Sequence, residues 1–517
     1  MMKTHQSQES PGPNPNPLNV YKGPKSMIQY FDPDLQPPLP LVELPAKLNP
    51  FKDDNVRIYA KMATALPAQN VKCLPALNML LNEPSAAHKT IIEQSSGSTV
   101  TSLGMIARVL YNNEASRAYV SNKAGVNRIK QLRFFGLNVE LYGGPSQPEI
   151  LDPRGTVRKA HLLGKESENF INPGQYDNEN NWTAHIRWTG PQIWKQLPEI
   201  NIFCMSMGTA GCITGTGMYL KSQKPSVTVL GVCNPVGDPI PGPRTLPLVE
   251  MCEFPWQKTV DAVEIVDSVD SYRLSMSLSQ EGLICGPSSG MNLKGLFNVL
   301  QKAKENGELH KYAETSTGEV SCVFLCCDLP YQYLDGYFTR LEDGEFPPIT
   351  NLGLLDVDTD EYDGRWEISA HSAMTMLYGQ HWNEEKHPFC SKAISNGVIH
   401  DKPEQSSKVT VIDLRSREDF DDEHICGAIS TPLANLTAAT PKPSDDVDTL
   451  QQQWKDLKAK CEEEELKNAL NAASNSCLVL CYNGETSRMA TAIMRAQGVE
   501  ACSVIEGIVA LRDLQIV

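Results

Sequence analysis

Short apolar runs alternate with longer amphipathic stretches along the first two-thirds of the chain. The segment RAYVSNKAGVNRIKQLRFFGLNVELYG shows the pattern: Ser121 or Asn122 can cap a helix, Gly136 can end it, and residues 139–142 resume as a strand. Strands that alternate with helices pack as a parallel sheet covered by helices, so the repetition predicts an α/β fold with a largely parallel sheet. We expect this fold from about residue 28 to residue 340.

The pattern breaks at LEDGEFPPITNLG, where acidic residues, Pro and Gly follow one another. Beyond the break, KVTVIDL and SCLVLC predict strands of a second α/β domain, with a polar helical insert between them. The start of the chain is rich in Pro, Asn, Ser and Gln, which is typical of a disordered tail. The predicted organisation is a tail over residues 1–26, a first domain over 27–340, a linker over 341–364 and a smaller domain over 365–517.

Composition narrows the class of protein. The chain has 517 residues, 41% of them hydrophobic, which is too long for one core and ordinary for a globular protein. A net charge of −16 disfavours nucleic acid or an anionic membrane as a partner, and no apolar run is long enough to span a bilayer. The fifteen cysteines are scattered and form no CxxC pair, which indicates buried thiols in a reducing compartment and no disulfide framework. With no apolar signal segment at the start, we expect a cytoplasmic protein.

The stretch VLCYNGETSRMA places Cys481 between an apolar strand and a predicted helix. Backbone N–H groups and the helix dipole at such a junction stabilise an anion, which suits a thiolate, a persulfide or a bound oxyanion. Arg488, in the first turn of the helix, adds a positive charge. On these residues alone, a buried cysteine that merely ends a strand remains an alternative.

Two motifs around this cysteine resemble the rhodanese (sulfurtransferase) family over most of residues 405–517: VIDLRSREDFDDEHICGAISTPL and CYNGETSRMA. The resemblance implies that Cys481 carries a persulfide, and it gives Asp413, Arg415 and His424 structural roles. It implies that the loop around the persulfide is formed by Tyr482, Asn483, Gly484, Glu485 and Thr486. Phosphatases of the same fold use Cys-x5-Arg, whereas Arg488 stands one position later, so the sequence favours sulfur transfer.

Lys72 lies in NVKCLPA, between a Pro-containing turn and an apolar helix. Apolar surroundings lower the pKa of a lysine and make it a usable nucleophile, although a surface lysine at a helix start is the alternative. Two loops supply context: the hydroxyl-rich EQSSGST suits a carboxylate, and the glycine-rich SMGTAGC suits a phosphate. No Gly-Lys pair follows the second loop, and its glycine spacing does not fit a dinucleotide fingerprint.

Six segments occur in the order found in pyridoxal-phosphate enzymes of the cysteine synthase and cystathionine β-synthase family, and residues 38–340 resemble that family. The segments are PLVELP, NVKCLPA, SSGST, NPGQYDNENNW, GTAGC and GPSSGMNLKGL. The resemblance implies a fold-type-II enzyme of two subdomains with parallel sheets, bound pyridoxal 5′-phosphate and a homodimer. It makes Lys72 the Schiff-base lysine and Ser288 the partner of the cofactor's ring nitrogen. The other implied cofactor contacts are Ser98, Gly208, Thr209, Ala210, Gly211 and Cys212, and the implied substrate contacts are Ser96, Gly97, Thr99 and Gln175.

Several positions depart from the family pattern. Ser98 replaces the asparagine that contacts the ring oxygen, and Cys212 replaces the last phosphate-binding threonine. Ala210 replaces a glycine, and Cys73 and Leu74 replace an Asp-Arg pair. Each change alters how the cofactor is bound or which substrate is accepted, so a non-catalytic scaffold remains an alternative for the first domain.

Together the two resemblances imply β-replacement on a serine- or cysteine-type amino acid through an α-aminoacrylate, coupled to sulfur transfer through Cys481. The expected partners are a small amino-acid substrate and a sulfur donor or acceptor, within sulfur amino-acid metabolism and cysteine biosynthesis. A β-eliminating lyase whose sulfur is trapped as a persulfide is the alternative. We expect no metal, because the spacing of His381, His387 and Cys390 fits no common zinc site.

Overall fold

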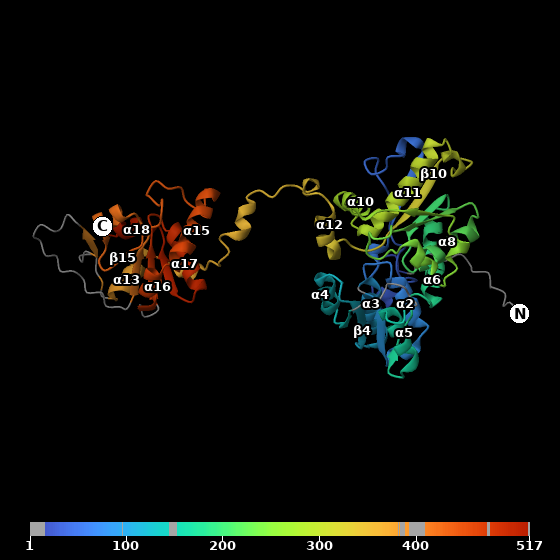
Figure 1. Ribbon diagram of the computed structural model, residues 1–517, viewed down its shortest axis with the longest axis horizontal. Coiled ribbons are helices and arrows are strands. Elements are labelled where there is room, and N and C mark those ends of the chain that lie inside the picture. The colour runs from blue at the N-terminus through green and yellow to red at the C-terminus, as the bar shows by residue number, and fades with distance from the viewer. Residues whose placement is uncertain are drawn as a thin grey trace, which may run out of the picture. The chain divides into compact units, whose positions relative to one another are not determined.

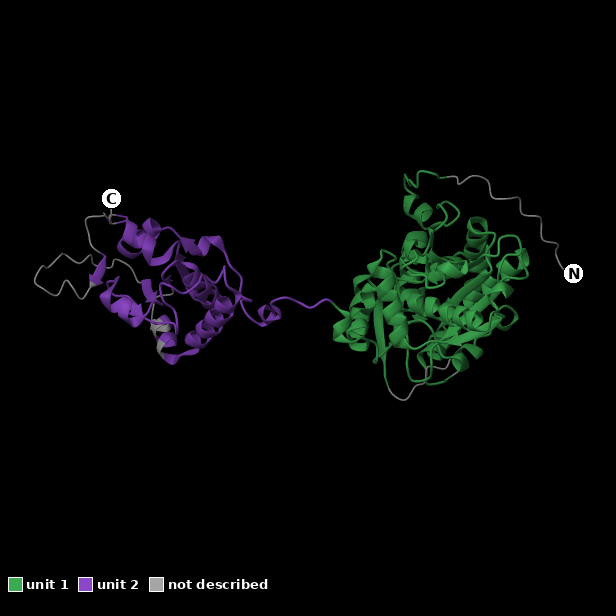
Figure 2. Ribbon diagram, turned by 90° about the horizontal axis from the view of Figure 1, so that it is seen from above, with its two compact units in different colours: residues 1–346 green, residues 347–517 purple. Residues whose placement is uncertain are grey.

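The computed structural model describes residues 16–95, 97–143, 152–380, 382, 388–391, 409–472 and 476–514. The chain forms two compact units, residues 1–346 (unit 1) and 347–517 (unit 2) (Figure 2). The division falls inside the stretch that the sequence predicts as a linker. Residues 1–15 of the predicted tail, together with Ser96, His381 and His387, lie outside the described residues.

Unit 1 contains a six-stranded sheet in the order β1-β2-β10-β7-β8-β9. Its strands are β1 (Leu41–Glu43), β2 (Val56–Met62), β10 (Val320–Cys326), β7 (Ile202–Ser206), β8 (Thr228–Cys233) and β9 (Ala262–Ile265). All neighbours are parallel except β1 and β2. Every residue of the central β10 is buried, as its continuous apolar run requires of a strand covered on both faces.

A second, fully parallel sheet in unit 1 has the order β5-β4-β3-β6. Its strands are β5 (Asn138–Tyr142), β4 (Ser116–Ser121), β3 (Thr90–Gln94) and β6 (Phe170–Ile171). The two sheets confirm the predicted α/β fold with two subdomains (Figure 1). The predicted helix cap at Ser121 or Asn122 is wrong: Ser121 still pairs with Tyr142 in the sheet, and α4 (Val126–Phe134) begins only after Gly125.

Four helices of unit 1 begin beside the sites that the sequence predicts. They are α2 (Cys73–Leu81), α3 (Ser98–Tyr111), α8 (Gly211–Gln223) and α11 (Pro287–Glu305). β3 leads into α3 and β7 leads into α8. The connecting loops therefore lie at the carboxyl ends of parallel strands, where ligands bind in open α/β sheets.

Unit 2 has a five-stranded parallel sheet in the order β11-β17-β16-β13-β15. Its strands are β11 (Glu367–Ile368), β17 (Glu500–Val504), β16 (Ser476–Leu480), β13 (Val409–Asp413) and β15 (Ile429–Ser430). Alternate residues of β16 enter different cores: Val479 packs with α15 (Val447–Glu462) and α17 (Glu485–Ala496), and Leu478 packs with α13 (Ala370–Tyr378) and α18 (Gly507–Asp513). Helices thus cover both faces of the sheet.

One cysteine pair departs from the sequence expectation. Cys390 on β12 (Phe389–Ser391) forms a disulfide with Cys426, which follows β14 (Glu423–Ile425). The antiparallel pairing of these two strands brings the two Cα atoms to 5.1 Å, within the range of a disulfide, and sequence spacing alone does not reveal this. The other thirteen cysteines are free, and all but Cys502 are buried.

No helix in the described parts of the chain has the length and apolar character that crossing a membrane would require.

The most buried charged pair of unit 2 joins Asp413 to Arg415. The Arg415 guanidinium lies 2.7 Å from the Asp413 carboxylate and donates to the carbonyl oxygen of Glu423, and neither side chain is more than 1% exposed. We expect Asp413→Ala to destabilise unit 2 by about 3–5 kcal/mol, because a buried guanidinium is left without its counter-charge. Urea unfolding, followed by hydrogen exchange of the β13 and β16 amides, would measure the loss. The matched control is Asp421→Ala, which breaks an exposed pair with Arg417 and should change stability far less.

Candidate active sites

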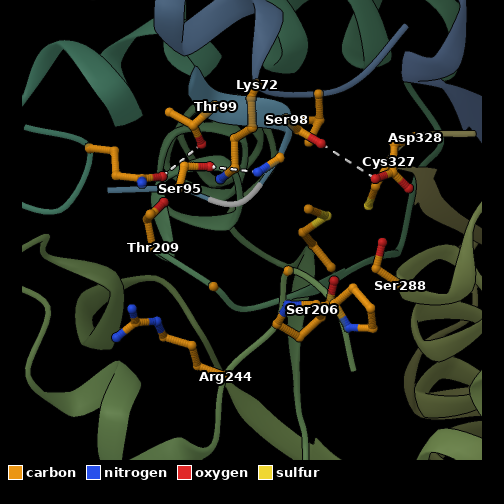
Figure 3. Close-up of a pocket in the computed structure, with 18 of the residues that line it drawn as sticks. Lys72, Ser95, Ser98, Thr99, Ser206, Thr209, Arg244, Ser288, Cys327 and Asp328 are labelled. Atoms are coloured by element: carbon orange, nitrogen blue, oxygen red, sulfur yellow. Dashed lines mark hydrogen bonds between the residues drawn. The ribbon is translucent and has the colours of Figure 1, made fainter. Parts of the chain in front are cut away.

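A cavity of about 250 Å³ opens in unit 1 where the loops after β3 and β7 meet the segments before α2 and α11 (Figure 3). Predicted residues from five separate segments converge on it. The predicted residues that line it are Lys72, Gly97, Ser98, Thr99, Gln175, Gly208, Thr209 and Ser288. Ala210, Gly211 and Cys212 do not line the cavity but continue the Thr209 loop into α8.

Lys72 immediately precedes α2, and its backbone N–H donates to Asn70 Oδ1 at 2.9 Å. The Lys72 side chain lines the cavity, so part of it is exposed to solvent, but protein atoms surround its amine. Burial lowers the pKa of the Lys72 amine. The lysine therefore loses its proton more readily than a surface lysine, as a nucleophile or base requires.

The turn before α8 is shaped to accept an anion. A Cβ on Gly208 would lie 2.5 Å from the carbonyl oxygen of Gly242, and one on Gly211 would lie 2.2 Å from Asn181 Oδ1. Ala210, between them, adopts a left-handed conformation with φ of 60°. The tight turn directs N–H groups of the α8 N-terminus toward one place, and the helix dipole adds to their field, so a phosphate group fits here. Burial raises the pKa of the nearby Cys212 thiol to about 12, which keeps it uncharged beside an anion.

The predicted carboxylate-binding residues are held in one network. Thr99 Oγ1 donates to Gln175 Oε1 at 2.7 Å, and Gln175 Nε2 donates to the carbonyl oxygen of Gln94 at 2.8 Å. A Cβ on Gly97 would lie 2.3 Å from Arg128 Nη2, so a larger residue here would displace the arginine side chain. The loop is thus positioned by its neighbours before any ligand arrives.

Ser288 and Lys72 line different walls of the cavity (Figure 3). Ser288 lies in the first turn of α11 and is 6% exposed. The next residue, Ser289, accepts the backbone N–H of Cys327 at 2.9 Å, which fixes the start of α11 against the end of β10. Ser288 therefore presents a hydroxyl group at this wall of the cavity.

Sequence reasoning missed two further groups in the cavity. Arg244 stacks on Tyr176 at 4.5 Å and donates to its hydroxyl at 2.7 Å. Asp328 follows β10 and accepts hydrogen bonds from Tyr333 at 2.5 Å and Gln332 at 2.9 Å, and burial raises its pKa to about 6. A signal for each was present: an arginine in the Pro- and Gly-rich PIPGPR, and an acid directly after the apolar run CVFLCC.

In unit 2, Cys481 follows β16 and is fully buried in the loop that leads into α17. Its sulfur accepts the backbone N–H groups of Gly484 at 3.1 Å and Ser487 at 3.3 Å, and its thiol contacts the Ser487 hydroxyl oxygen at 3.3 Å. These donors stabilise negative charge on the sulfur. The loop can therefore hold a reactive thiol or a persulfide.

The remaining residues of this loop are anchored to their surroundings. The Tyr482 hydroxyl donates to Asp419, the Glu485 carboxylate accepts the backbone N–H of Ser444 at 3.0 Å, and Thr486 Oγ1 donates to Gln453 at 2.8 Å. Asn483 Oδ1 accepts the backbone N–H of Glu485 at 3.2 Å. The Arg488 guanidinium lies 3.7 Å from the carboxylate of Glu367, which balances its charge.

The motif residues outside the loop make structural contacts. His424 Nδ1 lies 2.7 Å from the carbonyl oxygen of Phe420, and its ring stacks on the Phe420 ring. Together with the buried Asp413–Arg415 pair, this fixes the connection from β13 to β14.

The matches to known protein families fall on the same two units. Residues 34–315 match the family described as pyridoxal-phosphate dependent enzyme, and residues 399–512 match the rhodanese-like domain. The chain is similar to cysteine synthase B of Salmonella typhimurium, with 30% identity over 266 residues that make up 50% of this chain and 84% of the relative. It is also similar to a probable cysteine synthase of Bacillus subtilis, with 31% identity over 281 residues, 50% of this chain and 85% of the relative. Both resemblances predicted from the sequence are confirmed.

Among solved structures, a hydrogen sulfide-producing enzyme from Fusobacterium nucleatum matches with 23% identity and a TM-score of 0.48. The match covers 58% of this chain and 96% of that chain.

Gly484 provides a test of the cysteine loop. Its φ is 92°, and a Cβ would lie 2.9 Å from the backbone nitrogen of Glu506 and the carbonyl oxygen of Val504. We expect Gly484→Ala to displace the donors around Cys481 and slow its reaction with a persulfide donor roughly tenfold to a hundredfold. The rate is measured by mass spectrometry of the Cys481 peptide. The control Gly498→Ala has a similar φ of 86° with no atom in reach of the new methyl, so it should carry the backbone strain and keep the rate. Equal loss in both variants would contradict the role given to the loop.

Proposed function

Since this chain belongs to the pyridoxal-phosphate dependent enzymes, we propose that unit 1 catalyses β-replacement on a serine- or cysteine-type amino acid and that unit 2 transfers sulfur through Cys481. One observation carries the proposal for unit 1: predicted residues from five segments converge on one cavity around Lys72. The similarity of this region to cysteine synthases supports the class of substrate.

Four features would hold the cofactor. Lys72 would bind it covalently, the turn before α8 would take its phosphate, Ser288 would face its ring nitrogen and Ser98 its ring oxygen. When bound, pyridoxal phosphate withdraws electrons from the α-carbon of the attached amino acid. A serine opposite the ring nitrogen, in place of a carboxylate, favours loss of the β-substituent over transamination.

The chain's own residues would orient the substrate and move its proton. The Thr99–Gln175 pair and the backbone around Gly97 would hold the substrate carboxylate. Lys72 Nζ, freed from the cofactor when the amino group of the substrate takes its place, would then take the proton from the α-carbon, because burial lowers the pKa of its amine and keeps the amine able to accept a proton. The β-carbon is left open to a nucleophile.

Unit 2 would supply the sulfur nucleophile. The terminal sulfur of a Cys481 persulfide would bond to the β-carbon, and an external thiol would then reduce the resulting disulfide, which frees Cys481 and the thiol of the product. Two sites on one chain meet at a higher effective concentration than two separate molecules, provided that the connecting chain can span them. A persulfide on Cys481 would therefore react in the cavity around Lys72 faster than a free sulfur donor at the same bulk concentration. The match to the rhodanese-like domain and the three polar contacts to the Cys481 sulfur support this part of the proposal.

The first test concerns the cofactor. We expect the purified protein to absorb visible light and borohydride reduction to attach the cofactor irreversibly to Lys72, as peptide mapping would show. Lys61 is the matched control: burial lowers its pKa to about 7, but its amine donates to Leu39 and Gln196 and does not line the cavity. Lys72→Ala should lose the label, whereas Lys61→Met should keep it. A colourless protein that pyridoxal phosphate cannot restore would contradict the proposal.

The second test concerns the reaction. With L-serine or O-acetyl-L-serine and free sulfide, we expect L-cysteine to accumulate. Pyruvate and ammonia in equal amounts would instead identify a β-eliminating lyase. Cys481→Ser should keep the reaction with free sulfide and lose at least tenfold with a persulfide donor, about 1.4 kcal/mol in activation free energy. Cys502→Ser, a half-buried cysteine of the same sheet, should change neither reaction. If Cys481→Ser leaves both reactions unchanged, sulfur does not pass through unit 2.

A further inference from the structure

A second cavity of unit 1, about 170 Å³, adjoins the first and shares Gln175 and Tyr176 with it. The two cavities use opposite sides of β3. Gln94 lines the first and Glu93 lines the second, because successive residues of a strand point to opposite faces of the sheet. A molecule in the second cavity would therefore contact residues that also line the first.

Glu93 lines this cavity with a carboxylate group that is only partly hydrogen-bonded. It is 2% exposed, and its Oε1 accepts the backbone N–H of Gln94 at 3.1 Å. Its Oε2 is buried and has no hydrogen-bond partner of normal geometry within the described part of the chain. A buried carboxylate oxygen without a donor is costly, and burial raises the pKa of Glu93 to about 7, although the Gln175 backbone and the Asn172 side chain lie close enough to the carboxylate to oppose that rise.

The walls of the second cavity carry charges of both signs. Asp177 and Glu253 supply two further carboxylates, and Arg158 supplies a guanidinium. His161 Nδ1 lies 3.2 Å from Asp177 Oδ2. Burial raises the pKa of Asp177, and the Glu253 charge adds to the shift, so a cation bound here would relieve crowding among the acids. Carboxylates beside one guanidinium complement a molecule that has both an ammonium and a carboxylate group.

The size of the cavity limits its occupant. A volume of 170 Å³ holds about six water molecules at ~30 Å³ each. This space suits an amino acid whose side chain has one or two non-hydrogen atoms.

We propose that this cavity is a second binding site for a small free α-amino acid, whose ammonium group donates to Glu93 Oε2 and whose carboxylate pairs with Arg158. Because Gln175 and Tyr176 line both cavities, an amino acid bound in the second site changes the affinity of the first, and the effect is reciprocal. The site goes beyond the proposed reaction and does not depend on turnover.

Calorimetric titration of the full chain with L-serine tests the proposal. We expect two binding events in the wild type and in Lys72→Ala, in which the chemistry of the first cavity is disabled. Glu93→Gln should weaken one event roughly tenfold to a hundredfold, because a charged hydrogen bond is lost. L-Lactate, which has a hydroxyl in place of the ammonium, and ethanolamine, which lacks the carboxylate, should both fail to bind at the second site.

Arg158→Gln keeps the test valid if the buried Glu93 variant does not fold, because Arg158 is only partly buried, and it should weaken the same event. Glu166→Gln, an exposed position on the same helix α5 (Thr156–Glu166), is the control and should keep both events. One binding event in the wild type, or a second event that persists unchanged in both Glu93→Gln and Arg158→Gln, would overturn the proposal. Titration with L-alanine, which has no leaving group, separates an effector from substrate on its way to the first cavity: an effector site binds both amino acids, whereas a substrate site prefers L-serine.

Discussion

A parallel strand that leads directly into a helix leaves the first N–H groups of the helix without partners, and both candidate sites of this chain depend on that constraint. In unit 1 the constraint is met at the turn before α8, where Gly208 and Gly211 leave no room for side chains. In unit 2 it is met after β16, where two N–H groups point at the sulfur of Cys481. The same backbone feature thus suits a phosphate in one unit and a sulfur anion in the other.

The two reactive side chains are controlled in opposite ways. Lys72 is made less cationic by enclosure in protein, which favours a free amine. Cys481 instead accepts two backbone N–H hydrogen bonds at its sulfur. The proposed reaction would use both effects, because the amine must be free of its proton while the sulfur acts as a nucleophile.

The cavity of unit 1 is polar, and most of its polar groups are already engaged with one another. Thr99 is bonded to Gln175, Tyr333 to Asp328 and Arg244 to Tyr176. Such contacts lower the cost of ordering the site when a substrate binds, since the side chains are already in place. Asp328 in this cavity and Glu93 in the second cavity each keep one buried carboxylate oxygen that makes no hydrogen bond within the described residues.

The sequence determined the elements and the chemistry of individual loops. The apolar runs of β10 and β16 and the glycines near Thr209 and Cys481 act through local backbone geometry, so they predict strands, turns and reactive residues without knowledge of the fold. The start of one helix was predicted wrongly, because the pairing of Ser121 with Tyr142 extended β4 into the predicted cap.

Only the tertiary structure decided which distant residues meet. Arg244 and Asp328 enter the cavity because β8 and β10 end near it, and Cys390 meets Cys426 because β12 pairs with β14. The two faces of β3 likewise separate Glu93 from Gln94 into two cavities. Such contacts depend on which strands become neighbours, and that is fixed by packing of the whole core and not by any local run of residues.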